Sequence, residues 1–183
     1  MPAITDYDSL QKEVAGWLER EGDTSLTDRL PSIIQAAEGW FNRKLAGYQR
    51  EVATTLSTDA SGTVALPAGF VSVKSVERDG RPWPWRLSGK SIQMVAAGVG
   101  SFDLVYASRL VALSGDNTTN WLLEDAPDAY LYACMAQASV MLENFTSAAI
   151  YASQAETILS DLNLQSTAAQ FGMASLSIPG VVP

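Results

Sequence analysis

The chain has 183 residues, with 12 lysines and arginines against 20 aspartates and glutamates, so its formal net charge is −8. It has no histidine and one cysteine, which excludes Ser-His and Cys-His nucleophile pairs, histidine-ligated zinc and an internal disulfide. Hydrophobic residues make up 47% of the chain, enough to bury a core in one compact domain or one with a sub-domain. The first ten residues show no targeting pattern and no long apolar run occurs, so we expect a soluble intracellular protein.

The charges are distributed unevenly along the chain. No lysine or arginine follows Arg109, whereas seven acidic residues do. Between Arg43 and Lys90 the balance is reversed, with eight basic residues against four acidic ones. Proteins that recognise nucleic acid concentrate basic residues on one face and have a high pI, so DNA recognition is the less favoured interpretation of this middle stretch.

Two amphipathic helices are predicted before residue 48. In the first, Thr5 and Asp8 resemble a capping box, and apolar residues at helical spacing extend the helix from about Asp6 to Arg20. Pro31 suits the first turn of the second helix, which Gly47 ends. The second helix carries one apolar stripe, made by Ile34, Ala37, Phe41 and Leu45.

The middle of the chain reads as a small antiparallel β region. Residues 51–56 and 63–66 alternate around a turn-prone segment and predict a strand pair. Asp79-Gly80 predicts a hairpin, after which residues 81–87 return as a strand that Pro82 and Pro84 confine to an edge. Two further strands are expected at 91–95 and 102–110.

Helical spacing resumes near residue 121. Pro127 marks the first turn of a third helix, and Glu124, Asp125 and Asp128 are better explained by its dipole than by a cation site. Cys134 lies on the apolar stripe of this helix and is interpreted as a small buried hydrophobe. Thr146 can cap a fourth helix, rich in alanine, that ends near Leu162.

The prediction is therefore an α+β, mainly α fold. It has a four-helix core in the order α-α-β-α-α, a small antiparallel β sub-domain between the second and third helices, and an extended C-terminal tail. We expect helices 1 and 2 of the core in residues 1–48, the β sub-domain in 49–112, helices 3 and 4 in 113–164 and the tail in 165–183.

The last segment is unlike the rest. From Leu162 to Pro183 its apolar residues follow no helical stripe, and no charge occurs after Asp161. It can fold back on its own domain, fray, or dock on another chain as exposed apolar surface usually does. The residues that we expect in such a docking contact are Gln165, Phe171, Met173, Leu176, Ile178, Val181 and Val182.

The sequence Arg81-Pro82-Trp83-Pro84-Trp85-Arg86 is the most distinctive local cluster. Alternation places Trp83 and Trp85 on one face, where core packing is the first interpretation. A protein interface comes second, because tryptophan and arginine are enriched in binding hot spots. Stacking of single-stranded bases is third. On the second interpretation, Arg81, Trp83, Trp85 and Arg86 contact another protein chain.

Several segments resemble the head-to-tail adaptor (head-completion or connector) family of tailed bacteriophages over about residues 4 to 162. The second helix carries an Ala-Glu, Asn-Arg, Leu pattern in residues 36–45, and Leu66-Pro67-Ala68-Gly69-Phe70 leads into the β region as in the family. The segments that resemble the family most are Tyr106, Leu113-Ser114, Asn120-Trp121-Leu122-Leu123, Ala126-Pro127-Asp128 and Tyr130-Leu131-Tyr132.

The resemblance implies a structural virion protein without enzymatic activity and without a cofactor. Such a protein forms a ring, implied to have 12 copies, below the portal protein, extends the DNA channel and provides the platform for a downstream tail or nozzle protein. Packaged DNA would pass without specific binding, and the ring would assemble in the host cytoplasm. A stopper or tail-terminator ring is the nearest alternative, and a small nucleic-acid-binding module is a more distant one.

Overall fold

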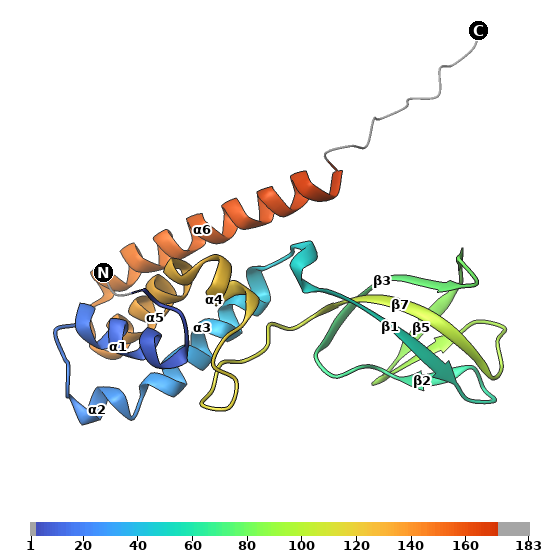
Figure 1. Cartoon of the computed structure of the whole chain (residues 1–183), viewed down its shortest axis with the longest axis horizontal. Coiled ribbons are helices and arrows are strands. Elements are labelled where there is room, and N and C mark those ends of the chain that lie inside the picture. The colour runs from blue at the N-terminus through green and yellow to red at the C-terminus, as the bar shows by residue number, and fades with distance from the viewer. Residues whose placement is uncertain (1–2, 172–183) are drawn as a thin grey trace, which may run out of the picture.

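The computed structural model describes residues 3–171. Helices gather at one end of the molecule and strands at the other, while the long last helix runs along the helical end (Figure 1). The helices are α1 Tyr7–Trp17, α2 Thr24–Thr27, α3 Leu30–Lys44, α4 Trp121–Asp125, α5 Pro127–Met141 and α6 Phe145–Phe171, with a 3₁₀ turn η1 at Tyr48–Arg50. The strands are β1 Glu51–Thr58, β2 Thr63–Ala65, β3 Phe70–Arg78, β4 Arg81–Pro82, β5 Trp85–Ser88, β6 Ser91–Met94 and β7 Gly100–Ser108.

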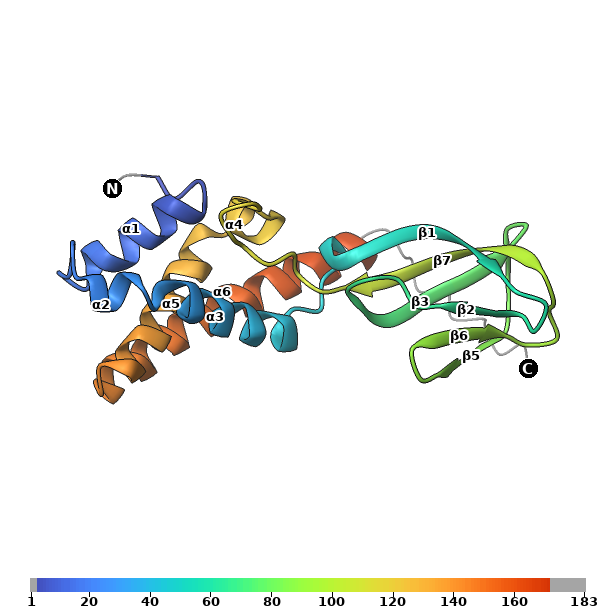
Figure 2. The same ribbon diagram turned by 90° about the horizontal axis from the view of Figure 1, so that it is seen from below.

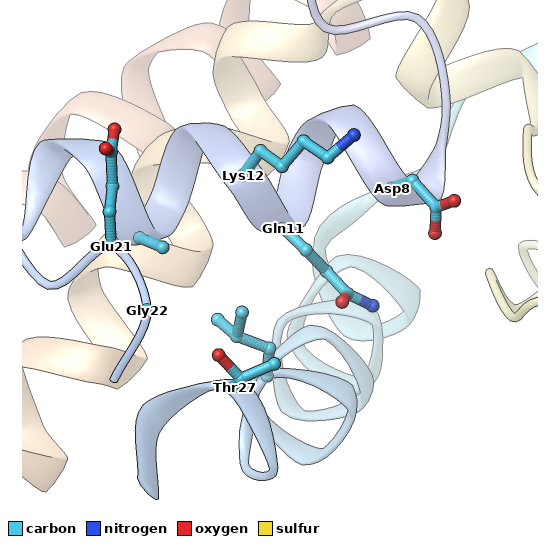
Figure 3. A pocket seen from close by; sticks show the side chains of 8 residues that line it. Asp8, Gln11, Lys12, Glu21, Gly22 and Thr27 are labelled. Carbon is cyan, nitrogen blue, oxygen red and sulfur yellow. The ribbon is translucent and has the colours of Figure 1, made fainter. Parts of the chain in front are cut away.

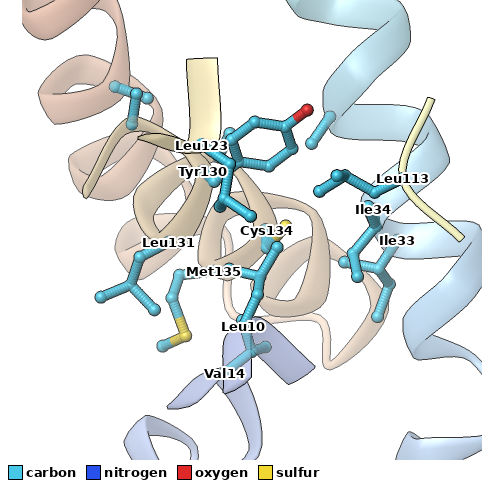
Figure 4. Packing of buried hydrophobic residues seen from close by; sticks show 14 of the residues in the cluster. Leu10, Val14, Ile33, Ile34, Leu113, Leu123, Tyr130, Leu131, Cys134 and Met135 are labelled. Atoms are coloured by element: carbon cyan, nitrogen blue, oxygen red, sulfur yellow. The ribbon is translucent and has the colours of Figure 1, made fainter. Parts of the chain in front are cut away.

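Helix α5 is the centre of the helical core, since α1, α3, α4 and α6 all pack against it. Its side chains Tyr130, Cys134 and Met135 are buried among Leu10 and Val14 of α1 and residues of α3 (Figure 4). Alanine at many α5 positions lets neighbouring helices approach on several sides, which explains why this helix is buried almost all round.

Polar residues cap the starts of α1 and α6. Asp6 caps α1, where its carboxylate accepts from the Ser9 amide at 2.8 Å and the Ser9 hydroxyl lies 2.9 Å from the Asp6 amide. Asn144 precedes α6 and accepts from the Ser147 amide at 3.2 Å. The predicted capping box of Thr5 and Asp8 is therefore wrong, because Asp6 and Ser9 form it. Asn144 replaces the predicted cap Thr146, whereas Pro127 begins α5 as predicted.

The strands form two antiparallel sheets, one in the order β1-β7-β3-β4 and one in the order β2-β6-β5. Their facing sides enclose a second hydrophobic cluster, separate from the helical one, made by Val76, Ile92, Met94, Phe102, Leu104 and Tyr106. Figure 2, turned by 90°, shows β5, β6 and β2 running alongside the larger sheet. The β region therefore has its own core.

The hairpin predicted at Asp79-Gly80 is confirmed. Both residues have positive φ, 52° and 73°, and join β3 to β4 with Arg78 opposite Arg81. Positive φ at both central positions is what a type I′ turn requires, and Asp-Gly supplies it at low cost.

The predicted fold class is wrong in three respects. The helical part is more than a four-helix core, because α2 and α4 add two short helices, capped by Asp23 and Asn120, that bury Leu26, Leu122 and Leu123. The β region is no small insert, because it has seven strands in two antiparallel sheets. The C-terminal segment is not extended from residue 165, because α6 continues to Phe171.

The strand pairing also differs from the prediction. Strands β1 and β2 belong to different sheets, where β1 pairs with β7 and β2 pairs with β6. Residues 81–87 form two short edge strands in place of one, with β4 in the larger sheet and β5 in the smaller. Pro84 lies between them and has no amide to continue a ladder, which accounts for the division.

Candidate interaction surfaces

A buried polar network joins α3, α4 and α5 through Glu38, the one acidic residue among the buried polar residues of the described chain. Its carboxylate accepts from the Leu113 amide at 2.7 Å and from the Tyr130 hydroxyl at 3.2 Å. The Asn120 amide group donates to the Tyr130 hydroxyl at 2.7 Å, and its carbonyl oxygen caps α4. Burial raises the pKa of Glu38 and of Tyr130, because it disfavours both charged forms.

A buried cation, Arg50, holds the helical part to the β region. Its guanidinium donates to the carbonyl oxygens of Leu45 at 2.6 Å and Ser108 at 2.8 Å, one at the end of α3 and the other at the end of β7. Burial lowers the pKa of this guanidinium, which belongs to a residue that is 5% exposed. The planar guanidinium of arginine can donate to several carbonyl groups at once. Arg50 therefore holds in place both segments that connect the helical part to the β region.

Helix α6 also holds this junction, through contacts with the segment between α3 and β1. The Ser166 hydroxyl accepts from the Tyr48 amide at 2.8 Å, and the Asn163 side-chain oxygen accepts from the Ala46 amide at 2.9 Å. Lys44 of α3 and Glu156 of α6 form an ion pair at 2.6 Å. Gly47 permits the close approach, since a Cβ at this position would lie 2.8 Å from the Ser166 hydroxyl oxygen.

The structure separates the two tryptophans of the predicted cluster. Trp83 packs edge-on against Phe102, with ring centroids 5.6 Å apart, and its indole N–H donates to the Val95 carbonyl at 3.2 Å. Trp85 is exposed on β5, together with Arg86, and Arg81 is exposed on β4. Core packing therefore describes Trp83, and a surface role is open to Trp85, Arg81 and Arg86.

The cluster has apolar neighbours that the sequence did not single out. Trp85, Leu87 and Val95 are 38%, 47% and 45% exposed. The amide of Val95 donates to the Pro84 carbonyl at 2.9 Å, so Val95 lies next to Trp85 but on the other face of the β5–β6 pair. In the sequence, the only indication of this apolar surface was the spacing of Trp85 and Leu87, which places both side chains on one face of a strand.

Of the residues predicted to dock at the C-terminus, Gln165 is exposed on α6 and Phe171 is the last residue of that helix. Met173, Leu176, Ile178, Val181 and Val182 lie outside the described residues.

A groove of about 510 Å³ runs between α1 and the α2–α3 segment (Figure 3). It is lined by Asp8, Gln11, Lys12, Ala15, Glu21, Gly22, Thr27 and Leu30. Asp8 and Glu21 stand at opposite ends of one wall, so the groove does not bring two carboxylates together as an acid and base pair. Asp23, beside it, caps α2 and pairs with Arg20 at 3.1 Å.

Across residues 3–171 no group of three side chains that could hold a metal ion is found. Glu124, Asp125 and Asp128, which lie around the α4–α5 junction, therefore do not form such a group. None of the helices in this part of the chain is both long and apolar enough to cross a membrane.

Cys134 is buried, which raises the pKa of its thiol and keeps it in the uncharged, unreactive form.

The sequence pattern of the SU10 adaptor protein family matches residues 5–178. The chain therefore belongs to the SU10 adaptor protein family and is a structural adaptor of a bacteriophage, a virion component and not a member of an enzyme family. Comparison with curated proteins gives no match.

Proposed function

We propose that this protein is a head-to-tail adaptor, forming a ring below the portal that extends the DNA channel and provides the docking platform for the tail. The observation that carries the proposal is the family match over residues 5–178, which spans the helical part, the β region and α6. Two cores locked together by Arg50 and α6 suit a subunit that must transmit a fixed geometry from one partner to the next.

The ring is proposed to have 12 copies. Native mass spectrometry of the protein with and without the portal protein of the same phage measures the number directly. Rings in either sample support the proposal, and a chain that stays monomeric in both contradicts it.

The portal contact is assigned to the uncharged C-terminal segment that begins at Gln165. Its first residues form the end of α6, and the following residues to Pro183 contain no charge. An uncharged apolar segment gains affinity by adding to a sheet edge or lying in a hydrophobic groove of its partner.

Truncation after Phe171 tests this assignment without removing any part of the described fold. The truncated chain is expected to retain its circular dichroism and thermal melt and to lose co-purification with the portal. Portal binding that survives the truncation would contradict the assignment.

Point substitutions within the same segment give a matched control. Leu176→Asp with Ile178→Asp places two charges at apolar positions, and Ser175→Asp with Ser177→Asp places two charges at neighbouring polar positions. Loss of portal binding is expected for the first variant alone, because burying an unpaired carboxylate is costly. Equal loss in both variants would show that added charge, and not the apolar side chains, decides binding.

The exposed part of the arginine–tryptophan cluster, Arg81, Trp85 and Arg86, is proposed to contact a neighbouring subunit or the tail protein below. Trp83 supports this surface from inside the β region, since it packs against Phe102. Packaged DNA is proposed to pass through the ring without specific binding.

A further inference from the structure

Strand β5 presents an apolar surface that the larger sheet leaves uncovered. Trp85 and Leu87 lie opposite Met94 and Ile92 in the β5–β6 ladder, and opposite residues of an antiparallel pair share a face. Met94 and Ile92 are 1% and 0% exposed, whereas Trp85 and Leu87 are 38% and 47% exposed. The larger sheet therefore covers the inner face at β6 but not at β5.

The backbone of β5 is also open on one side. Among the described residues β5 is the last strand of its sheet, with β6 as its ladder partner. An edge strand with uncovered apolar side chains is a template for association, and proteins usually blunt it with charge, proline or a covering element. We call this edge the β5 patch. Trp85 and Leu87 lie on its inner face, Arg86 and Val95 lie on the opposite face, and Arg81 and Lys90 precede and follow the strand in sequence.

The charges of the β5 patch are all positive and are not neutralised within the described chain. None of the ion pairs found in residues 3–171 includes Arg81, Arg86 or Lys90. Arginine and tryptophan are both enriched in binding hot spots. The occupant of this patch should therefore be acidic and should offer some apolar surface.

The same chain carries such a surface at the α4–α5 junction. Glu124, Asp125 and Asp128, which we call the acidic corner, take part in no ion pair among the described residues. Val111, 60% exposed, lies beside them, since its carbonyl accepts from the Asn120 side chain that caps α4. The acidic corner belongs to the helical end and the β5 patch to the strand end (Figure 1).

We propose that the β5 patch of one copy docks on the acidic corner of a second copy. Because the two patches differ and lie at different ends of the chain, this contact is heterologous, and heterologous contacts close into rings when the rotation allows. The inference rests on the proposed ring and assigns the surfaces through which its subunits meet. Trp85 and Leu87 supply the buried centre of this interface, and the charged residues of the two patches fix how the two copies align.

Charge reversal with rescue tests the contact. The strand variant carries Arg86→Glu and Lys90→Glu, and the corner variant carries Asp125→Lys and Asp128→Lys. Each variant alone is expected to lose at least about tenfold in self-association, since like charges then face each other. An equimolar mixture is expected to recover assemblies in which the two variants alternate in a 1:1 ratio. The control variant Arg29→Glu with Arg43→Glu reverses two charges outside both patches and should assemble as the parent chain does.

Assembly is measured by native mass spectrometry with the portal protein present, so that rings that need the portal are also scored. Circular dichroism of each variant checks that the reversal has left the fold intact. A parent chain that remains monomeric overturns the ring and the contact together. A parent ring that either variant also forms, or a mixture that fails to recover assembly, overturns the contact and leaves the ring standing.

Cross-linking gives a second readout that does not depend on charge. Since Cys134 is buried, a variant with Leu87→Cys and Glu124→Cys has two exposed thiols, one in the β5 patch and one in the acidic corner. Oxidation of the assembled variant should give a ladder of covalent oligomers, and the variant with Leu87→Cys and Arg29→Cys should not. Equal ladders in the two variants, or none in either, would contradict the contact.

Discussion

The two buried charges, Glu38 and Arg50, are both satisfied by uncharged groups. Glu38 accepts from an amide and a phenol, and Arg50 donates to backbone carbonyls and to Asn42. Neither residue has an oppositely charged partner among the contacts of the described chain. Such networks demand one arrangement of the surrounding segments, because an unsatisfied buried polar group costs about 1–3 kcal/mol.

Glu38 makes stability depend on pH. Its pKa in the folded protein is raised above the reference value of 4.5, mainly by burial, so the folded state holds the proton more tightly than the unfolded chain. The stability that this group contributes is fully present below the reference value and is lost as pH rises through the folded-state pKa. A tenfold difference in proton affinity between the folded and unfolded states changes the free energy of unfolding by about 1.4 kcal/mol.

The substitution Glu38→Gln removes this titration and retains a side-chain oxygen for Leu113 and Tyr130. The difference in free energy of unfolding, variant minus parent, is expected to rise in favour of the variant between about pH 4 and pH 8. Urea unfolding at several pH values measures it. Glu21→Gln is the matched control because it removes an exposed carboxylate, and a Glu38→Gln profile parallel to that of the control would refute the prediction.

These two residues show what the sequence can reveal at this scale. Glu38 lies four residues after Ile34, on the apolar stripe of α3, so its burial was predictable from spacing. Its partners, Leu113 and Tyr130, are 75 and 92 residues away in sequence, and no local pattern predicts which groups meet. Arg50 showed no signal, because its partners are mainly backbone carbonyls, which every residue carries.

Among the elements, the helices with caps and apolar stripes were predictable, whereas the short ones were not. Helices α2 and α4 have 4 and 5 residues, too few to show a period, and tertiary burial of their leucines stabilises them. The C-terminal segment was expected to be extended because its apolar residues follow no stripe. Helix α6 nevertheless extends to Phe171, supported by contacts of Ser166 and Gln170 with η1 and β1.

The contact of Ser166 with Tyr48 tests how α6 holds the junction. Ser166→Ala leaves the Tyr48 amide without its acceptor and is expected to lower the free energy of unfolding by about 1 kcal/mol. Hydrogen exchange at the Tyr48 amide should become faster, because local opening costs less. The adjacent control Gln165→Ala alters an exposed side chain and should change neither measurement. Unchanged exchange at Tyr48 in the Ser166→Ala protein would show that α6 does not hold the segment between α3 and β1 in place.

At the scale of the whole molecule, basic and acidic residues are concentrated in different elements. The β region holds many of the basic residues, and the helices after residue 110 carry only acidic ones. The sequence alone revealed this asymmetry, because counting charges requires no fold. It could not reveal that the larger sheet leaves β5 uncovered, which depends on how far one sheet extends over the other.

This distribution predicts that the protein does not bind double-stranded DNA. Counterion release requires clustered basic contacts, and residues 110–183 contain seven acidic residues and no basic one. Fluorescence anisotropy with a labelled duplex is expected to show no binding at low salt. An affinity that falls steeply as salt rises would favour a nucleic-acid-binding module, since its strength would come from phosphate contacts. In that case, the variant with Arg81→Gln and Arg86→Gln should lose the affinity, because these exposed side chains lie in the most basic part of the β region.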